Sequence, residues 1–201
     1  MIHPHAPGVP DEAFSRGSAP MSKMEVRAVT VAKARIVSDA RVLDVGAGTG
    51  ALSIDAALAC PAGEVVAVER SADALALLHE NVERLATGNV TVVAGEAPEA
   101  LEQVEGVFDV VLIGGSGGRL GEIVSALPPR LVAGARVVVN TIGLESTRAA
   151  LDALGREPWT GRDCVQVSVS RAEPIGSDLR FVPLNPVWIV SAMLGEGEGS
   201  R

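Results

Sequence analysis

The sequence predicts an α/β fold in which helices cover both faces of a seven-stranded, mostly parallel β-sheet with one antiparallel strand. Short apolar segments alternate with helical segments along most of the chain, which is typical of a parallel sheet buried on both faces. The last two strand-like segments have no helix between them, as is usual for antiparallel neighbours. With 201 residues, 47% of them hydrophobic, the chain is long enough for one packed domain.

The chain is expected to begin with an extended N-terminal arm over residues 1–20, which are rich in Pro and Gly. A single domain follows over residues 21–192, and residues 193–201 form a polar tail. The first helix is expected over residues 21–38. Ser22 and Glu25 have the spacing of a capping box there, and apolar residues recur at helical intervals.

Strands and helices then alternate, and Gly or Pro marks most boundaries. Helices are expected over residues 51–60, 72–86, 98–103, 121–131 and 144–155, with an interruption of the segment 121–131 near Pro128 and Pro129. Strands are expected over residues 41–45, 64–69, 90–94, 108–113, 135–141, 164–170 and 186–191. The last two strands are joined by a helix-free segment with Pro174 and Gly176, which we interpret as a loop.

Composition excludes several classes of function. The net charge of -8 argues against a surface that binds nucleic acid through its phosphates. No apolar run approaches the roughly 18 residues of a membrane-spanning helix. The N-terminus lacks a targeting signal, so a cytoplasmic protein is expected. Two cysteines are too few for a zinc site, and we interpret His3 and His5 as a surface pair without a metal.

A glycine-rich loop over residues 44–50 leaves the first strand and enters a helix. Such loops let a ligand approach the backbone and the helix N-terminus closely. Gly46, Gly48 and Gly50 are spaced G-x-G-x-G, whereas a dinucleotide-binding loop has G-x-G-x-x-G, which disfavours a dehydrogenase. With Asp44 before it, the loop resembles the first motif of class I S-adenosylmethionine methyltransferases. Asp44 is then expected to face the ammonium group of that ligand.

Two further strand ends carry acidic residues. Glu69 ends the second strand and can accept hydrogen bonds from both ribose hydroxyls. Glu96 and Ala97 follow the third strand, at the corner where the adenine is expected. Glu96 can accept from the exocyclic amine, and the Ala97 N–H can donate to a ring nitrogen.

A second glycine-rich loop, over residues 113–119, follows the fourth strand. Gly114, Gly115 and Ser116 leave room for a large flat substrate at the carboxyl end of the sheet. The Asn/Asp-Pro-Pro-aromatic motif of many amino methyltransferases is absent here, which argues against methylation of DNA adenine or of glutamine.

Several segments together resemble the C15-methyltransferase/decarboxylase family of the cobalamin pathway. The similarity runs from residue 8 to about residue 192. It is carried by residues 8–14, 20–27, 95–101, 113–118, 166–171 and 185–189. The resemblance implies a class I S-adenosylmethionine-dependent methyltransferase (Rossmann-like) fold. It also implies methylation at C15 of a precorrin tetrapyrrole and decarboxylation of its C12 acetate.

The resemblance also implies binding residues and partners. The cofactor set carried over is Ser22, Gly46, Ala47, Gly48, Thr49, Gly50, Glu69 and Ala97. Ser22 stands where many members have Thr, and either hydroxyl can make the bond. A homo-oligomer, most simply a homotetramer, is implied. So is a C5-methylating domain, which in the family is either fused or separate.

A polycarboxylate substrate needs local positive charge on this acidic protein. The candidates are Lys23, Arg27, Arg119, Arg171 and Arg180. We favour Arg119 and Arg171, because both adjoin glycine- or serine-rich loops at strand ends and Arg suits carboxylates. No catalytic residue is assigned, since methyl transfer to an electron-rich carbon depends mainly on positioning. His79 is interpreted as a surface residue.

Three other functions remain open on the sequence alone. The chain could be another class I methyltransferase, acting on a small molecule or a protein carboxylate. It could instead be a cofactor-binding subunit that is inactive without a C5-methylating partner. A dehydrogenase is the third alternative, disfavoured by the glycine spacing.

Overall fold

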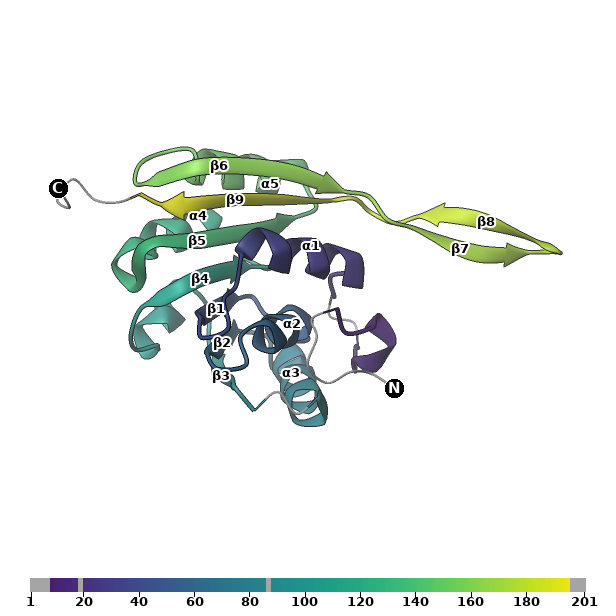
Figure 1. Ribbon diagram of the computed structural model, residues 1–201, viewed down its shortest axis with the longest axis horizontal. Helices are drawn as coiled ribbons and strands as arrows, with labels where there is room; N and C mark the ends of the chain where they lie inside the picture. The colour runs from purple at the N-terminus through teal and green to yellow at the C-terminus, as the bar shows by residue number, and fades with distance from the viewer. Residues whose placement is uncertain (1–7, 18–19, 86–87, 196–201) are drawn as a thin grey trace.

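The structure is a computed structural model that describes residues 8–17, 20–85 and 88–195. Its centre is a seven-stranded sheet with the order β3-β2-β1-β4-β5-β9-β6 (Figure 1). β1 pairs in parallel with β2 and β4, and β5 pairs in parallel with β4. β9 is antiparallel to both of its neighbours, β5 and β6. The strands are β1 Arg41–Val45, β2 Glu64–Glu69, β3 Val90–Ala94, β4 Phe108–Ile113, β5 Leu131–Thr141, β6 Trp159–Val167 and β9 Val187–Leu194.

Helices cover both faces of this sheet, and each face has its own hydrophobic core. One core packs α1 and α2 against strand residues such as Val42 and Ile189. The other packs α4 and α5 against residues such as Leu43 and Val137. The helices are α1 Met24–Ala34, α2 Ala51–Ala59, α3 Ala72–Leu85, α4 Leu120–Ala126 and α5 Leu144–Ala153. The fold class and the single antiparallel strand predicted from the sequence are confirmed.

The first helix is shorter than expected. It begins after Lys23, and no side-chain hydrogen bond caps it. The predicted capping box of Ser22 and Glu25 is therefore wrong. The helix ends at Ala34, before the predicted residue 38, because the next residue, Arg35, has a left-handed conformation. The predicted helix over residues 98–103 is a short 3₁₀ segment, Glu99–Gln103.

The interruption of the fourth long helix near Pro128 and Pro129 is confirmed, and two strands begin earlier than expected. The helix predicted over residues 121–131 ends at Ala126 and continues as a 3₁₀ turn over Pro128–Arg130. A Pro in that position has no N–H for the helix ladder. β5 consequently begins at Leu131, four residues before the predicted 135. β6 begins at Trp159, five residues before the predicted 164.

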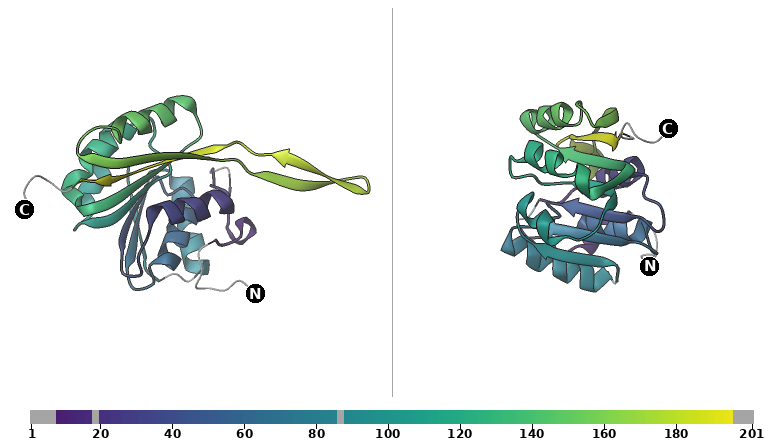
Figure 2. Two further views of the ribbon diagram at one scale, coloured as in Figure 1. Left: turned by 45° about the horizontal axis from the view of Figure 1, so that its top comes forward. Right: turned by 90° about the vertical axis from the view of Figure 1, so that its left-hand side faces the viewer.

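The predicted loop between the last two strands is a β-hairpin instead. β7 Ser170–Ile175 pairs with β8 Asp178–Pro183 in a separate two-stranded sheet. The hairpin extends away from the main sheet (Figures 1 and 2). Its residues are mostly exposed, so neither strand needs the apolar alternation by which a buried strand is identified.

Residues 8–17, which belong to the expected extended N-terminal arm, pack on the domain. Val9 and Phe14 are buried, and Arg27 stacks over the Phe14 ring. The backbone N–H groups of Gly8 and Val9 donate to Asp55 on α2. Residues 8–17 are thereby joined to the sheet's helical layer. His3 and His5 lie outside the described residues.

None of the described helices is long and apolar enough to cross a bilayer. Over the same residues, no group of three or more His, Cys, Asp and Glu side chains could hold a metal ion.

Candidate functional site

The two predicted glycine loops meet at the carboxyl ends of β1 and β4. The Gly114 N–H donates to the Val45 carbonyl over 3.0 Å, which ties the second loop to the first. Gly46 has a φ of +70°, and a Cβ built on it would lie 2.2 Å from the Gly115 carbonyl oxygen. Only glycine therefore fits at position 46. The contact separates two cavities that both touch Gly46.

The smaller cavity, of about 120 Å³, is acidic. Its wall includes Glu69, Arg70, Glu96, Ala97 and residues 115–117. Glu69 is 8% exposed. Hydrogen-bond acceptors of this kind suit a ligand that presents hydroxyl and amine donors.

Glu69 also organises the backbone around this cavity. Its Oε2 accepts from the Gly48 N–H over 2.8 Å, and its Oε1 accepts from the N–H groups of Arg70 and Ser71. One carboxylate thus joins the first glycine loop to the end of β2. Each carboxylate oxygen has further lone pairs for a ligand.

The larger cavity, of about 350 Å³, lies on the other side of Gly46. Residues 20–23, the first glycine loop, Gly114 and the facing ends of β5 and β9 form its wall. Ile142, Leu184 and Val187 make one part apolar, and Asn140 and Asn185 are polar. Among its lining residues no side chain is acidic, and Lys23 alone is charged. No ion pair involves Lys23 within the described parts of the chain.

The predicted cofactor residues divide between these cavities. Ser22, Ala47, Gly48 and Thr49 line the larger one, and Glu69, Glu96 and Ala97 line the smaller one. Gly50 lines neither. It turns the chain into α2 with a φ of +80°, and a Cβ there would lie 2.2 Å from the Leu78 side chain.

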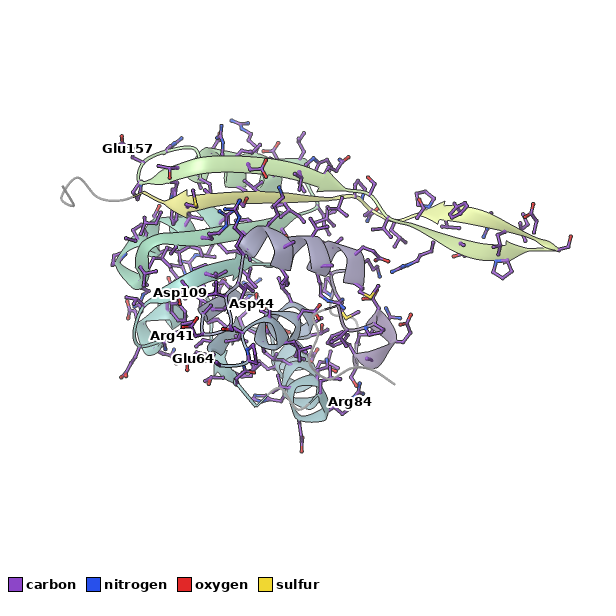
Figure 3. The ribbon with its side chains drawn as sticks, in the orientation of Figure 1. Arg41, Asp44, Glu64, Arg84, Asp109 and Glu157 are labelled. Carbon is purple, nitrogen blue, oxygen red and sulfur yellow. The ribbon has the colours of Figure 1, made fainter. Side chains whose placement is uncertain are left out.

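Asp44, which is labelled in Figure 3, lies in β1 just before the loop, and it lines neither cavity. It is 1% exposed, and its Oδ2 accepts from the Ser53 hydroxyl over 2.5 Å. Its Oδ1 has no hydrogen-bond partner among the described residues. Burial raises the pKa of Asp44 to about 6, the Ser53 hydrogen bond opposes this rise, and the charge of Glu69 adds to it. The structure therefore gives no support to a direct contact of Asp44 with an ammonium group.

The second glycine loop is divided as well. Gly114 lines the larger cavity, whereas Gly115 and Ser116 line the smaller one. The sequence predicted that all three residues lie on the substrate side. In the structure, Gly115 and Ser116 lie instead beside Glu69 and Glu96. Gly115 lies against Gly46, at the boundary between the two cavities.

The favoured arginines lie outside both cavities. Arg119 donates to both Glu99 oxygens over 2.6 Å and also pairs with Glu122. This pairing raises the pKa of Arg119 and lowers that of Glu99 to about 2. Arg171 pairs with Glu25 and lies 3.6 Å from Asp11. Their charges are thus already compensated by neighbouring carboxylates.

The other two candidates are also paired. Arg27 is fully buried between Asp11 and Asp55, at 2.7 and 2.6 Å, and cannot meet a substrate. Arg180 pairs with Glu173 across the hairpin. Lys23 is the remaining candidate. His79 is exposed on α3, as expected.

Sequence reasoning missed several lining residues. Arg70 lines the smaller cavity, and only its position directly after Glu69 could have indicated this from the sequence. Asn140 and Ile142 lie at the end of β5, and Leu184 and Asn185 lie before β9. These positions sit at the same sheet edge as the glycine loops only because β9 lies beside β5.

Comparisons with known proteins agree on one family. A family model described as "Precorrin methyltransferase domain" matches residues 12–193. A Salmonella typhimurium protein named cobalt-precorrin-6B C(15)-methyltransferase (decarboxylating) is 40% identical over 187 residues, covering 92% of this chain and 96% of that protein.

Solved structures agree with this comparison. The crystal structure of precorrin-6y C5,15-methyltransferase from Geobacter metallireducens GS-15 has a TM-score of 0.88 and 33% identity, and the match covers 93% of this chain and 98% of that one. A SAM-dependent O-methyltransferase from Thermotoga maritima has a TM-score of 0.74 at 16% identity, covering 90% and 68% of the two chains. The second likeness concerns the fold alone.

Proposed function

The chain belongs to the precorrin methyltransferase domain family, and we propose on this premise that it is a C15-methyltransferase of cobalamin synthesis. It transfers a methyl group from S-adenosylmethionine to C15 of a precorrin tetrapyrrole and removes the C12 acetate carboxylate as CO2. The observation that carries the proposal is the opposite charge of two adjoining cavities. One presents Glu69 and Glu96 beside Arg70, and the other has Lys23 and no acidic side chain.

The residues of the smaller cavity fit the nucleoside part of S-adenosylmethionine. Glu69 and Glu96 are acceptors for the ribose hydroxyls and the adenine amine, respectively. Gly46 lines both cavities and Gly48 lines the larger one; neither has a side chain, so a ligand can approach their backbone closely. When bound, the cofactor supplies a methyl group on a sulfonium, which an electron-rich carbon can accept.

The larger cavity fits a flat molecule that carries carboxylates. Ile142, Leu184 and Val187 offer an apolar wall for the macrocycle, and they exclude water from it. Lys23 provides one cation for a peripheral carboxylate. Lys23 has no carboxylate partner among the described residues, whereas Arg119 and Arg171 have such partners.

The protein's contribution to the reaction is mainly positioning. The contact between Gly46 and Gly115 fixes the boundary where the two cavities adjoin, and holding two reactants in line can lower a barrier by about 7–11 kcal/mol. For the decarboxylation, the bond to the carboxylate breaks, CO2 leaves, and the electron pair enters the conjugated macrocycle. The carbon that remains takes up one proton, and methylation of the macrocycle releases one proton, so the two steps together leave the number of protons unchanged.

Turnover of a C5-methylated precorrin with methyl-labelled S-adenosylmethionine tests the proposal. We expect a product that has gained one labelled methyl group and lost one CO2, measured by mass spectrometry. Binding of S-adenosylhomocysteine without turnover would instead support a subunit that needs a partner. Binding of NAD in preference to S-adenosylhomocysteine would contradict the proposal.

Calorimetry with S-adenosylhomocysteine tests the role of Glu69. Glu69→Ala should weaken binding by about one to two decades. Because Glu69 also accepts from three backbone N–H groups, this variant should lose stability too. Glu69→Gln, which keeps one acceptor oxygen, is the matched control. Parental affinity in both variants would contradict the assignment.

We also propose that the protein assembles into a homotetramer through its hairpin. Ile175, Leu179 and Phe181 on the hairpin are 54, 59 and 74% exposed. Apolar side chains and free strand edges on a projecting hairpin favour pairing with another copy. Light scattering should return about four times the chain mass of 20.6 kDa, and the double variant Leu179→Ser, Phe181→Ser should have a lower mass. A monomeric parent protein would contradict the proposal.

A further inference from the structure

Arg70 bridges three segments that surround the smaller cavity. It directly follows Glu69 at the end of β2. Its guanidinium lies 2.5 Å from a carboxylate oxygen of Glu96, which follows β3. The guanidinium also covers Gly117 in the loop after β4, since a Cβ on Gly117 would lie 3.0–3.2 Å from its atoms. One side chain thus joins the ends of three strands.

The backbone of Arg70 is held by the carboxylate next to it. The Arg70 N–H donates to Glu69 Oε1 over 2.9 Å, and the Ser71 N–H donates to the same oxygen. Glu69 is therefore tied to Arg70 through the backbone, and Arg70 is tied to Glu96 through its side chain. These contacts form a continuous chain from the ribose side of the cavity to the adenine side.

The hydrogen bond from Arg70 changes what Glu96 can do. A free carboxylate on an exposed side chain rotates among many positions, and ordering it on binding costs entropy. Arg70 engages Oε1 only, which leaves Oε2 for another donor. A carboxylate fixed in this way accepts from an amine and repels a carbonyl oxygen at the same place.

We propose that Arg70 is a specificity-determining positioning residue, which orients Glu96 toward the exocyclic amine of adenine. The inference rests on the proposed function, because it takes the smaller cavity as the nucleoside site. It goes further in naming the residue that makes the site selective for an aminopurine over an oxopurine. Gly117 leaves the space that the Arg70 guanidinium occupies, because a side chain at Gly117 would displace it.

A purely structural ion pair would behave differently. Arg70 and Glu96 are 55 and 43% exposed, and exposed ion pairs contribute little to stability. Removing Arg70 should therefore leave the melting temperature nearly unchanged. A positioning role predicts instead a change in ligand preference that a structural role would not produce.

The test compares two ligands by calorimetry: S-adenosylhomocysteine and its inosine analogue, in which a carbonyl replaces the exocyclic amine. The parent protein should bind the adenine compound about tenfold to a hundredfold more tightly. Arg70→Met should lose most of this preference, and Arg70→Lys should keep part of it. Glu96→Gln should lose it too, and the double variant should be no worse than either single one, as expected for coupled residues.

Arg148→Met is the matched control, because Arg148 is an exposed arginine that lies 3.7 Å from Asp152, outside both cavities. It should keep the full preference. An unchanged preference in Arg70→Met would overturn the inference, as would additive losses in the double variant. If the parent protein binds neither compound, the proposed function is wrong and this inference is wrong with it. If it binds both equally, only the inference is wrong.

Discussion

Gly46 and Gly115 touch through their backbones, and the contact is not symmetrical. A Cβ on Gly46 would lie 2.2 Å from the Gly115 oxygen and 2.6 Å from its Cα. A Cβ on Gly115 would meet nothing closer than 3.7 Å, at Gly46. Although the two glycines are in contact, a side chain can therefore be added at Gly115 but not at Gly46.

We expect Gly46→Ala to lower the stability by more than about 2 kcal/mol, because it adds a clash to a positive φ. It should also abolish binding of S-adenosylhomocysteine. Gly115→Ala should change stability by less than about 0.5 kcal/mol, as at ordinary surface sites. Chemical unfolding and calorimetry on both variants check this. Similar losses in the two would contradict the asymmetry.

Gly115→Val separates the two possible positions of the second glycine loop. The sequence predicted that a side chain at Gly115 would obstruct the substrate and spare the cofactor. Because Gly115 lines the smaller cavity, we now expect Gly115→Val to weaken binding of S-adenosylhomocysteine by at least about tenfold. Parental affinity for that ligand together with lost methylation would restore the original interpretation.

Asp44 makes the stability depend on pH in a defined direction. Burial raises its pKa from 3.8 to about 6, so the folded protein binds this proton more tightly than the unfolded chain does. The charged form therefore costs stability above pH 6, by about 3 kcal/mol at most. This cost falls as the pH drops from about 6 to about 4, where both states are protonated.

Asp44→Asn should remove this cost. The variant should gain stability relative to the parent at pH 8, and the difference should shrink as the pH falls through 6. Urea unfolding at pH 8 and pH 5 measures it, with Asp39→Asn on the exposed surface as the control. A difference between variant and parent that does not change with pH would contradict the raised pKa.

The sequence predicts best the parts of the fold that are local. Residues 41–45, 64–69, 90–94 and 108–113 form strands with the predicted bounds. Most of them are buried on both faces, so their apolar runs are continuous. The glycine loop and Glu69 were also found, because loop and helix follow each other in the chain. The hairpin was missed because its strands contact mainly each other and solvent.

The site was predicted less well, because several of its candidate residues form ion pairs with residues that are distant in the sequence. Arg27 is buried because Asp55, on another helix, reaches it. Arg119 is captured by Glu99, which lies 20 residues earlier in the chain. No local pattern marks either pairing, since each depends on how the elements pack. For the same reason, the sequence could not choose Lys23 over these arginines.

Arg27 should be essential for holding the N-terminal segment on the domain. It is fully buried, with Asp11 and Asp55 as partners, and it also donates to the Val9 and Ser22 carbonyls. Arg27→Met leaves the buried Asp55 without its cation and leaves Asp11 with only Arg171, at 3.6 Å, so we expect a loss of about 3–5 kcal/mol. Urea unfolding measures the loss. Adding Asp55→Asn should restore part of it, and a loss below about 1 kcal/mol would contradict the role.

The last prediction concerns Lys23, which we propose as the cation for a substrate carboxylate. Among the residues that line the larger cavity, Lys23 is the only charged one. Lys23→Met should therefore raise the KM for the precorrin about tenfold, which corresponds to the loss of one charge-assisted hydrogen bond. The affinity for S-adenosylhomocysteine should stay near the parental value. Lys33→Met is the control, since Lys33 pairs with Asp163 away from the cavity. Arg119→Met should leave the KM nearly unchanged, because Glu99 and Glu122 already hold that guanidinium. A raised KM in Arg119→Met and a parental KM in Lys23→Met would reverse the assignment.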